Sequence, residues 1–280
     1  MRIRVIDAFA DRPFAGNPAA VCLLDTAAWP DEAWMQQIAA EINLETAFAH
    51  RLPADIDADW ALRWFTATGE SNLCGHATLA TAHALHCDRG TAGTVRFSSP
   101  SGVLIAHTRD DGTITLDFPA ALPTEAPAPV GLADALGVQP EATYRTGALG
   151  DLLAILPDEA TVRALTPEVA ALARLTRRDA IRGIIATAPA MDRNSGYDFV
   201  SRYFAPANGI AEDPVTGSAH TALGPYWSSR LSSIALTGLQ ASARTGLVRT
   251  VVHGDRVYLT GHAVTILDGT LQQPPDKPRT

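Results

Sequence analysis

The chain has 280 residues, of which 46% are hydrophobic and 19% are charged, and its formal net charge at pH 7 is −8. This length fits one large or two ordinary domains, and the composition is that of a well-packed soluble protein. The negative charge and the lack of any basic run argue against a nucleic-acid-binding surface. No apolar stretch reaches the ~20 residues that span a membrane, and residues 1–5 read as a strand rather than a signal peptide, so we expect a cytoplasmic protein with no membrane partner.

Residues that would mark a metal or cofactor site are scarce in this sequence. The three cysteines, Cys22, Cys74 and Cys87, have no CxxC spacing, so we predict neither a disulfide framework nor a zinc site. Pyridoxal phosphate needs a buried lysine, and the only lysine is Lys277, in the polar tail. No P-loop or GxGxxG motif follows a strand, so nucleotide binding is unsupported. We therefore expect no metal and no organic cofactor.

The first part of the chain reads as strands with one amphipathic helix among them. Strands are predicted over residues 2–10, 17–24, 44–52, 59–66, 94–98, 103–108 and 113–118. A helix is predicted from Pro30 to about Asn43, with two acidic residues in its first turn that favour the positive end of the helix dipole. Its buried face is predicted from apolar residues at i, i+4 and i+8, namely Trp34, Ile38 and Ile42.

Two later stretches contain no charged side chain, residues 74–86 and 217–229, and we predict that both are helices buried on all sides. Pro225 is expected to bend or end the second. Each stretch opens on or next to a glycine and follows an Arg-aromatic-Phe strand pattern, at residues 63–65 and 202–204. We interpret this as an internal duplication, with two unrelated alanine-rich helices as the alternative. Free N–H groups where a buried helix starts would favour an anion.

Residues 119–130 contain four prolines and are predicted to be a linker between domains at 1–118 and 131–280. The second domain repeats the plan of the first, with a helix from Thr166 to about Leu175. Its strands are predicted over residues 151–156, 182–187, 198–204, 240–243, 248–252, 256–259 and 263–267. We predict an α+β fold of two similar domains, each a curled, mostly antiparallel sheet around a buried helix. A pseudo-twofold would point both helix starts into one interdomain cleft.

Glu45 and His76 are candidates for acid–base chemistry in the first domain. In the strand over residues 44–52, Glu45 lies on a face with small alanines, which leaves room for a ligand; the alternative is a surface glutamate at a strand edge. His76 follows Gly75 at the helix start, where the positive helix end would lower its pKa and leave a neutral imidazole to relay a proton. The alternative is a hydrogen-bonded core histidine. His76 and His83 stand at i and i+7 without a carboxylate or thiolate at ligand spacing, which argues against a metal.

Three more side chains near the helix starts can take part in chemistry. Asp213, which precedes a proline, would orient a substrate ammonium or act as a base, or else make only a local turn. Ser218 lies in VTGSA rather than in a GxSxG nucleophile elbow, so we predict that it binds a carboxylate. Cys74 at a helix N-terminus is expected to have a lowered thiol pKa, with a small buried cysteine as the alternative.

Four segments together resemble the PhzF-like family of phenazine biosynthesis, which belongs to the diaminopimelate-epimerase-like fold. They are FAGNPAAVCLL, NLETAFAH, RWFTATGESNLCGHATLA and RYFAPANGIAEDPVTGSAHTALGPYW. The likeness extends from the first strand to the closing ASARTGLVRTVV segment. It implies two similar domains, usually assembled as a homodimer, and a cofactor-independent isomerase that moves a proton on a small carboxylate-bearing substrate. The characterised phenazine member of the family acts on a dihydro-hydroxyanthranilate.

The resemblance also implies roles for individual residues. The family's catalytic glutamate, the histidine of its CGHAT motif and the aspartate and serine of its DPVTGSAH motif fall on Glu45, His76, Asp213 and Ser218. Its helix-start glycines, whose N–H groups hold substrate oxygens, match Gly75 and Gly217.

Racemases and epimerases of this fold use two opposed cysteines, and the sequence resembles them only in part. Cys74 matches the first cysteine, but Thr216 stands at the second place and cannot supply a thiolate. A two-thiol racemase is therefore disfavoured. Two alternatives remain: a racemase or epimerase that uses Cys74 as a single thiol, and a non-catalytic small-molecule binding protein.

Overall fold

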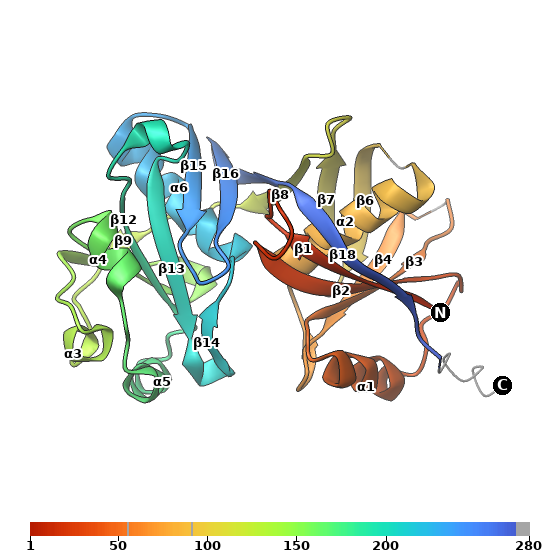
Figure 1. Ribbon diagram of the computed structural model, residues 1–280, viewed down its shortest axis with the longest axis horizontal. Helices are drawn as coiled ribbons and strands as arrows, with labels where there is room; N and C mark the ends of the chain where they lie inside the picture. Colours follow the sequence, from red (N-terminus) through yellow and green to blue (C-terminus); the bar gives the residue numbers. More distant parts are fainter. Residues whose placement is uncertain (55, 91, 273–280) are drawn as a thin grey trace. The chain divides into compact units, whose positions relative to one another are not determined.

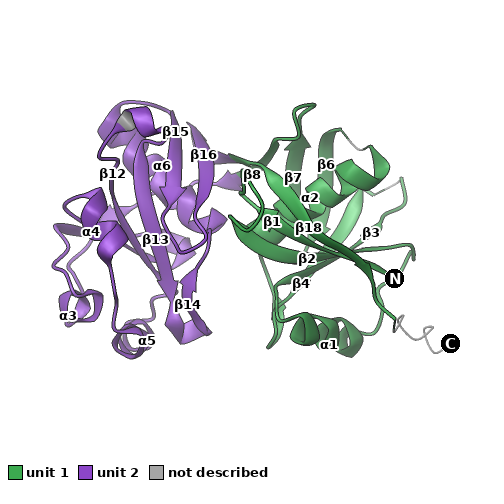
Figure 2. Ribbon diagram, in the orientation of Figure 1, with its two compact units in different colours: residues 1–117, 260–280 green, residues 118–259 purple. Residues whose placement is uncertain are grey.

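The computed structural model describes residues 1–54, 56–90 and 92–272, so the polar tail with Lys277 lies outside the described part. These residues form two compact units, shown in different colours in Figure 2. Unit 1 contains residues 1–117 and the segment from Thr260 onward, and unit 2 contains residues 118–259. The sequence pattern places the last segment in the second domain, whereas its strand β18 (Ala263–Thr270) pairs antiparallel with β1 (Arg2–Ala8). A strand pattern does not reveal which strand is its neighbour.

The sheet of unit 1 is mixed, with mostly antiparallel and two parallel pairings among its described strands (Figure 1). Besides β1 and β18 its strands are β2 (Asn17–Leu24), β3 (Thr46–Arg51), β4 (Trp60–Phe65), β5 (Glu70–Ser71), β6 (Gly93–Ser99), β7 (Gly102–Thr108) and β8 (Ile114–Pro119). Antiparallel pairing joins β1 to β2, β3 to β4, β4 to β5, β6 to β7 and β7 to β8. β2 is parallel to β3, and β4 is parallel to β6. Each parallel pair needs a crossover, and a helix lies within each one.

The helix α1 (Glu32–Ile42) makes the first crossover, as the sequence predicts. The Asp31 carboxylate caps its start by accepting a hydrogen bond from the Ala33 N–H. Asn43 ends it in the left-handed conformation, with φ of 54°. Met35 and Ala39 are its fully buried residues, and the predicted apolar face is only partly buried against the same core.

The helix α2 (Gly75–Arg89) makes the second crossover of unit 1. Nine of its side chains are buried, which confirms what its lack of charge predicts. It contacts β1, β2, β3 and β7, so the sheet surrounds it. Its first residue, Gly75, follows directly on the loop that leaves β5. The start of the helix lies beside the first residue of β2, because the side-chain amide of Asn17 is 3.4 Å from Nδ1 of His76.

Unit 2 is built from strands and helices in the same way. Its strands are β9 (Thr124–Glu125), β10 (Ala142–Arg145), β11 (Leu152–Ile155), β12 (Ile184–Pro189), β13 (Phe199–Ala205), β14 (Ile210–Asp213), β15 (Ala235–Gln240), β16 (Gly246–His253) and β17 (Arg256–Gly261). Its α-helices are α3 (Leu132–Leu136), α4 (Glu159–Ala164), α5 (Val169–Arg178) and α6 (Gly217–Leu231). Three short 3₁₀ turns lie at residues 147–149, 193–195 and 206–208. Part of the predicted linker is thus a strand, because β9 pairs with β10.

The helix α6 continues past Pro225 to Leu231, so of the two outcomes expected at this proline, a bend or an end of the helix, the end is wrong. A proline has no N–H to offer the carbonyl four residues earlier, here that of Thr221. The Thr221 carbonyl instead accepts a hydrogen bond of 3.1 Å from the N–H of Ala121. The acceptor that proline leaves unpaired is therefore satisfied from outside the helix.

The two units repeat one connectivity. In unit 1 the pairings run β2 parallel to β3, β3 antiparallel to β4 and β4 parallel to β6. In unit 2 the strands β11, β12, β13 and β15 pair in the same order and directions. A buried helix of 15 residues, α2 or α6, precedes the last strand of each set. The predicted α+β fold of two similar units, each a sheet around a central helix, is confirmed.

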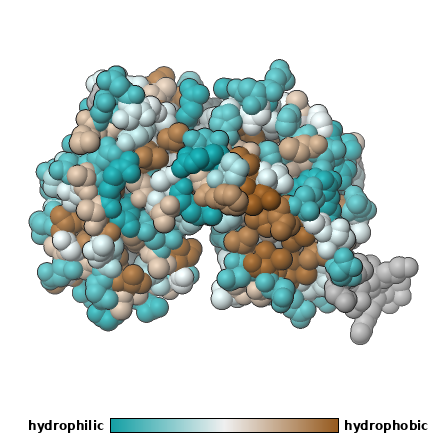
Figure 3. All heavy atoms as spheres, in the orientation of Figure 1, coloured by the Kyte–Doolittle hydropathy of each residue, from teal (hydrophilic) through white to brown (hydrophobic). Residues whose placement is uncertain are grey.

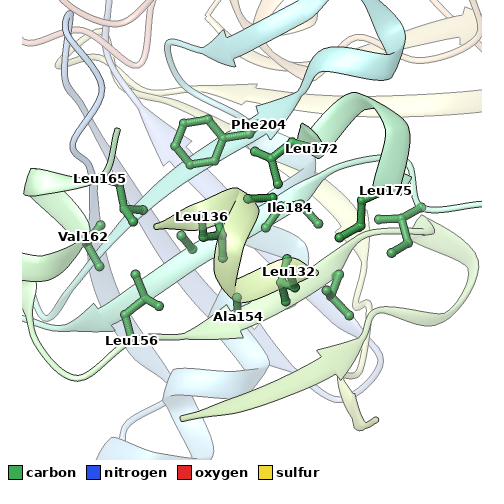
Figure 4. Packing of buried hydrophobic residues seen from close by; sticks show 14 of the residues in the cluster. Leu132, Leu136, Ala154, Leu156, Val162, Leu165, Leu172, Leu175, Ile184 and Phe204 are labelled. Carbon is green, nitrogen blue, oxygen red and sulfur yellow. The ribbon is translucent and has the colours of Figure 1, made fainter. Parts of the chain in front are cut away.

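Hydrophobic residues fill both faces of the unit 2 sheet. Alternate residues of β11, β12 and β13 face opposite sides, as the two-residue period of a strand requires. One face packs on α6, and the other packs on α3, α4 and α5 (Figure 4). On the second face Leu172 and Leu175 of α5 lie against Ile184 and Phe204 of the sheet. Burial of each such side chain contributes ~1.5–3 kcal/mol to stability. This packing holds the strands β11, β12 and β13 in place.

The surface of unit 1 has an apolar region of its own. On the visible face in Figure 3, hydrophobic residues gather over β1, β2 and β18. Leu267 of β18 remains 51% exposed.

Among the described residues, no helix combines the length and the hydropathy needed to cross a membrane.

Candidate active site

Three predicted side chains meet at the start of α2 in unit 1. Oε2 of Glu45 lies 2.9 Å from Nε2 of His76, and the Cys74 thiol donates to the same oxygen over 3.3 Å. The Cys74 sulfur also lies 3.6 Å from Nδ1 of His76, which lies 3.4 Å from the side-chain amide of Asn17. Glu45 precedes β3, and its carbonyl accepts from the N–H of Ala20 over 2.9 Å, so the parallel strand β2 holds its backbone. Glu45 is therefore not an isolated surface glutamate.

The pair of Glu45 and His76 is charged. Burial alone would lower the pKa of His76, but Cys74 and Glu45 beside it raise that pKa well above the ordinary 6.5. Burial alone would raise the pKa of Glu45, yet His76 and the hydrogen bond from Cys74 bring it below the ordinary 4.5. The expected lowering of the His76 pKa by the helix dipole is wrong. A dipole end carries about half a charge, whereas the Glu45 carboxylate carries a full charge at 2.9 Å.

The thiol of Cys74 is protonated at neutral pH. Burial and the nearby Glu45 carboxylate raise its pKa to about 11. The sequence leads us to expect a lowered pKa at this helix start, and that expectation is wrong because desolvation outweighs the helix end. Since the thiol keeps its proton, Glu45 is the charged partner of His76.

The same three residues are also the one group of possible metal ligands found among the described residues. One ligand atom from each of Glu45, Cys74 and His76 lies within 4.8 Å of the others. The separations of 2.9, 3.3 and 3.9 Å approach those between ligands of a tetrahedral zinc ion. Spacing along α2 alone does not show this, because Glu45 comes from another element. The protons on the thiol and the imidazolium disfavour a metal, since both must leave before it binds.

The start of α2 offers backbone donors to a ligand. Its cap residue, Cys74, makes no side-chain hydrogen bond to the first turn. Within the part of the chain that the structure describes, the N–H groups of Gly75 and His76 have no hydrogen-bond partner. These two N–H groups can stabilise negative charge on an oxygen.

The start of α6 in unit 2 is held by Gln240, a fully buried residue that sequence reasoning misses. Its side-chain oxygen accepts from the Thr216 N–H over 2.8 Å, and its amide donates to the Asp213 carbonyl, also over 2.8 Å. The Thr216 hydroxyl in turn donates to the Asp213 carboxylate. Thr216, which the resemblance matches to the second cysteine of racemases of this fold, thus connects Gln240 to the Asp213 carboxylate by hydrogen bonds.

Ser218 lies in the first turn of α6, next to Gly217. Its hydroxyl oxygen accepts a hydrogen bond of 3.0 Å from Arg182, a second residue that the motifs do not reveal. The N–H groups of Gly217 and Ser218 have no hydrogen-bond partner among the described residues. His220 is a core residue, because burial lowers its pKa to about 4 and its Nδ1 lies 2.8 Å from the Thr216 carbonyl. Asp213 and Ser218 therefore both lie close to this helix start, as the sequence predicts.

The duplicated fold is that of diaminopimelate-epimerase-like proteins, and Glu45 and His76 lie in contact at the start of its first buried helix. The family of phenazine biosynthesis-like proteins matches residues 6–269, and the chain belongs to this PhzF family. A Pseudomonas aeruginosa protein described as an uncharacterized isomerase is 45% identical over 268 residues, which cover 95% of this chain and 96% of that one. A PhzF family protein of Enterococcus faecalis has a TM-score of 0.87 at 41% identity, with 96% of this chain and 97% of that chain covered. A probable proline racemase of Agrobacterium radiobacter shares the fold, with a TM-score of 0.64 at 12% identity over 99% of this chain and 94% of that one.

Proposed function

We propose that this chain is a cofactor-independent isomerase that moves a proton on a small carboxylate-bearing substrate, with Glu45 as the acid–base group. The observation that carries the proposal is the 2.9 Å contact between Oε2 of Glu45 and Nε2 of His76. It keeps the carboxylate ionised and fixes its direction. A carboxylate in this form is ready to accept a proton from carbon.

The proton transfer would begin on Glu45. Its carboxylate takes the proton as a carbon–hydrogen bond of the substrate breaks, and the electron pair spreads into an adjoining double bond or carbonyl. The N–H groups of Gly75 and His76 and the positive charge of His76 stabilise the negative charge that develops. Glu45 then returns the proton to another carbon, so no atom is gained or lost. Such a group contributes ~10²–10⁴-fold to a rate.

The residues of unit 2 are assigned to binding. Ser218 and the N–H of Gly217 bind an anion, in our proposal the carboxylate of the substrate. Asp213, fixed by the hydroxyl of Thr216, orients a polar group of the substrate or relays a proton. The assignment is supported by the direction of these donors at the helix start. The resemblance to the family leads us to propose a homodimer in the cytoplasm as the working form.

A racemase that uses Cys74 as a single thiol is the second candidate. In its favour, the sulfur lies beside both Glu45 and His76, at 3.3 and 3.6 Å. Against it, the pKa of about 11 leaves almost no thiolate at neutral pH. We therefore assign the proton transfer to Glu45, with Cys74 as a hydrogen-bond donor.

The test is a comparison of Glu45→Gln with Glu41→Gln, an exposed glutamate on α1 that serves as control. Small carboxylic acids with a carbon–hydrogen bond beside a double bond or carbonyl are incubated with each protein in deuterated water. Nuclear magnetic resonance follows both isomerisation and deuterium uptake, so a proton carried directly between carbons is also seen. We expect Glu45→Gln to lose ~10²-fold or more in turnover and Glu41→Gln to lose none. Equal turnover of both variants would assign the proton to another group, and no turnover by the wild type would favour a binding protein.

A further inference from the structure

Gly183 occupies in unit 2 the position that Glu45 occupies in unit 1. The Leu152 N–H donates to the Gly183 carbonyl over 2.9 Å, as the Ala20 N–H donates to that of Glu45. A side chain at residue 183 has no room, because a Cβ atom there would lie 2.3 Å from the Tyr203 hydroxyl. The duplication has therefore left unit 2 without a counterpart of the acid–base glutamate.

The residue before this glycine, Arg182, supplies a fixed positive charge instead. Its Nε donates to Asp151 over 2.8 Å, and its Nη2 donates to the other oxygen of the same carboxylate. Asp151 is fully buried and also accepts from the Tyr203 hydroxyl over 3.0 Å. The guanidinium carbon lies 5.7 Å from the centre of the Tyr203 ring. A two-point contact with a buried carboxylate gives the guanidinium a single orientation.

The guanidinium also reaches the first turn of α6. Its Nη2 donates to the Ser218 hydroxyl oxygen over 3.0 Å, so the hydroxyl hydrogen is available for another acceptor. The two N–H bonds of Nη1 have no hydrogen-bond partner among the residues that the structure describes. The side chain is 37% exposed, so a small molecule can reach it. Asp151 occupies the edge of the guanidinium formed by Nε and Nη2, which directs Nη1 away from it.

We propose that Arg182 is the residue that recognises a carboxylate, with Nη1 and the Ser218 hydroxyl as the two donors. The inference rests on the proposed function only in taking this carboxylate to be that of the isomerised molecule. Charge-assisted hydrogen bonds to a carboxylate are about twice as strong as neutral ones. Arg182 thus makes unit 2 selective for an acid over the neutral amide of the same shape.

The two helix starts would then have opposite tasks. In unit 1 a carboxylate, Glu45, lies beside the helix start and would accept and return the proton. In unit 2 a cation, Arg182, stands at the start of α6 and would hold an anion. The negative charge of Asp213 also acts on Arg182, since it helps to raise the Arg182 pKa. A substrate anion would bind on the Nη1 side of the guanidinium, because N–H donors remain there.

Benzoate and benzamide are suitable probes, because they share a shape and differ in charge. Their binding to the full chain is measured by calorimetry for the wild type, Arg182→Gln and Arg249→Gln. Arg249 is exposed on β16, so its variant loses the same charge from unit 2 and serves as control. We expect Arg182→Gln to bind benzoate at least ~10-fold more weakly, or ~1.4 kcal/mol, with benzamide unchanged. Arg249→Gln should match the wild type.

Removal of Arg182 leaves Asp151 as a buried carboxylate without its cation, which can prevent folding. The double variant Asp151→Asn with Arg182→Gln removes that charge and carries the same measurement, with folding checked by circular dichroism. The proposal is overturned if a folded variant without Arg182 still prefers benzoate as the wild type does, or if the wild type shows no preference.

Failure of this inference can be told apart from failure of the proposed function. Glu45→Gln should keep the preference for benzoate, because Arg182 is untouched, while turnover is lost. If Glu45→Gln retains turnover but Arg182→Gln loses the preference, only the proton assignment is wrong. If Glu45→Gln loses turnover and Arg182→Gln keeps the preference, only the carboxylate assignment is wrong.

Discussion

The thiol of Cys74 donates a hydrogen bond of 3.3 Å to the carboxylate of Glu45. A thiol that donates its proton in this way supports the charge on Glu45 but does not take a proton from the substrate as the base of a racemase would. We predict that Cys74→Ser, whose hydroxyl can make the same hydrogen bond, keeps turnover within ~10-fold of the wild type, or ~1.4 kcal/mol in the barrier. Steady-state kinetics on any substrate found for the wild type measures this. A folded Cys74→Ser protein without activity would move the assignment to a single-thiol racemase.

Burial of the side chains predicts which of the three cysteines reacts with an alkylating reagent. Cys22 and Cys74 are buried, and burial raises their thiol pKa values to about 12 and about 11, whereas Cys87 is exposed. We expect iodoacetamide at neutral pH to label Cys87 first, as read by mass spectrometry of peptides, without loss of activity. Cys87→Ser should then take up almost no label. Rapid labelling of Cys74 would show a thiolate that this geometry does not support.

The charged pair of Glu45 and His76 makes stability depend on pH. The raised pKa of His76 contributes stability that is complete below the ordinary 6.5 and is lost as pH rises through the folded value. The lowered pKa of Glu45 contributes stability present above the ordinary 4.5 and lost as pH falls through the folded value. The pair therefore contributes most between these two pH values. We expect the free-energy difference between wild type and His76→Asn, from urea unfolding, to shrink as pH rises above 6.5.

His83 provides the control for that measurement, because its shift has the opposite sign. Burial lowers the pKa of His83 to about 4, so this residue costs stability as pH falls from 6.5 toward that value. His83→Asn should therefore gain on the wild type at acidic pH, where His76→Asn should lose. Parallel pH profiles for the two variants would contradict the charged state of His76.

Metal ions give a further test of the cluster in unit 1. If the enzyme works without a metal, prolonged treatment with EDTA should leave turnover unchanged. Added Zn²⁺ should inhibit at concentrations high enough to displace the protons of the thiol and the imidazolium, because the three ligand atoms at the Glu45 site lie close enough to share an ion. Inhibition should weaken at least ~10-fold in Cys74→Ser, since a hydroxyl is a poorer zinc ligand than a thiolate. Loss of activity on chelation would show that a metal takes part in the reaction.

Gln240 is predicted to be important for stability although it takes no part in the chemistry. Its replacement by leucine would leave the Thr216 N–H and the Asp213 carbonyl without their partner. A buried group left unpaired costs ~1–3 kcal/mol, and we expect at least this loss in urea unfolding. Gln37→Leu, at an exposed position of α1, is the control and should change stability by less than ~0.5 kcal/mol. A loss no larger than in the control would mean that water replaces Gln240 at the helix start.

The sequence predicts the buried helices and the acid–base candidates Glu45 and His76 because each leaves a local mark. A helix without charges, a glycine at its start and a glutamate among alanines can all be seen within one segment. Arg182 and Gln240 leave no such mark, since their partners Asp151 and Thr216 lie 31 and 24 residues away. Their importance depends on which strands become neighbours, and that is a property of the fold.

The direction of the pKa shifts was also beyond the reach of the sequence. The helix start is visible in the sequence and favours a neutral His76 and an ionised Cys74. The structure reverses both, because Glu45 lies 2.9 Å from His76 and because Cys74 is almost fully buried. Distance and desolvation decided the result, and neither can be read from residue spacing.

The pairing of β1 with β18 has a consequence for how the chain folds as it is synthesised. Arg2 and Thr270 are neighbours in the sheet, so one edge of β1, which pairs with β2 on its other edge, has no partner until residues 263–270 have left the ribosome. Unit 2 is continuous in sequence, from residue 118 to residue 259, and can close first. Unit 1 meanwhile keeps an open strand edge, which is a site for pairing with other chains. A nascent chain halted before β18 should therefore resist protease in unit 2 while it remains sensitive in the segment that carries Glu45.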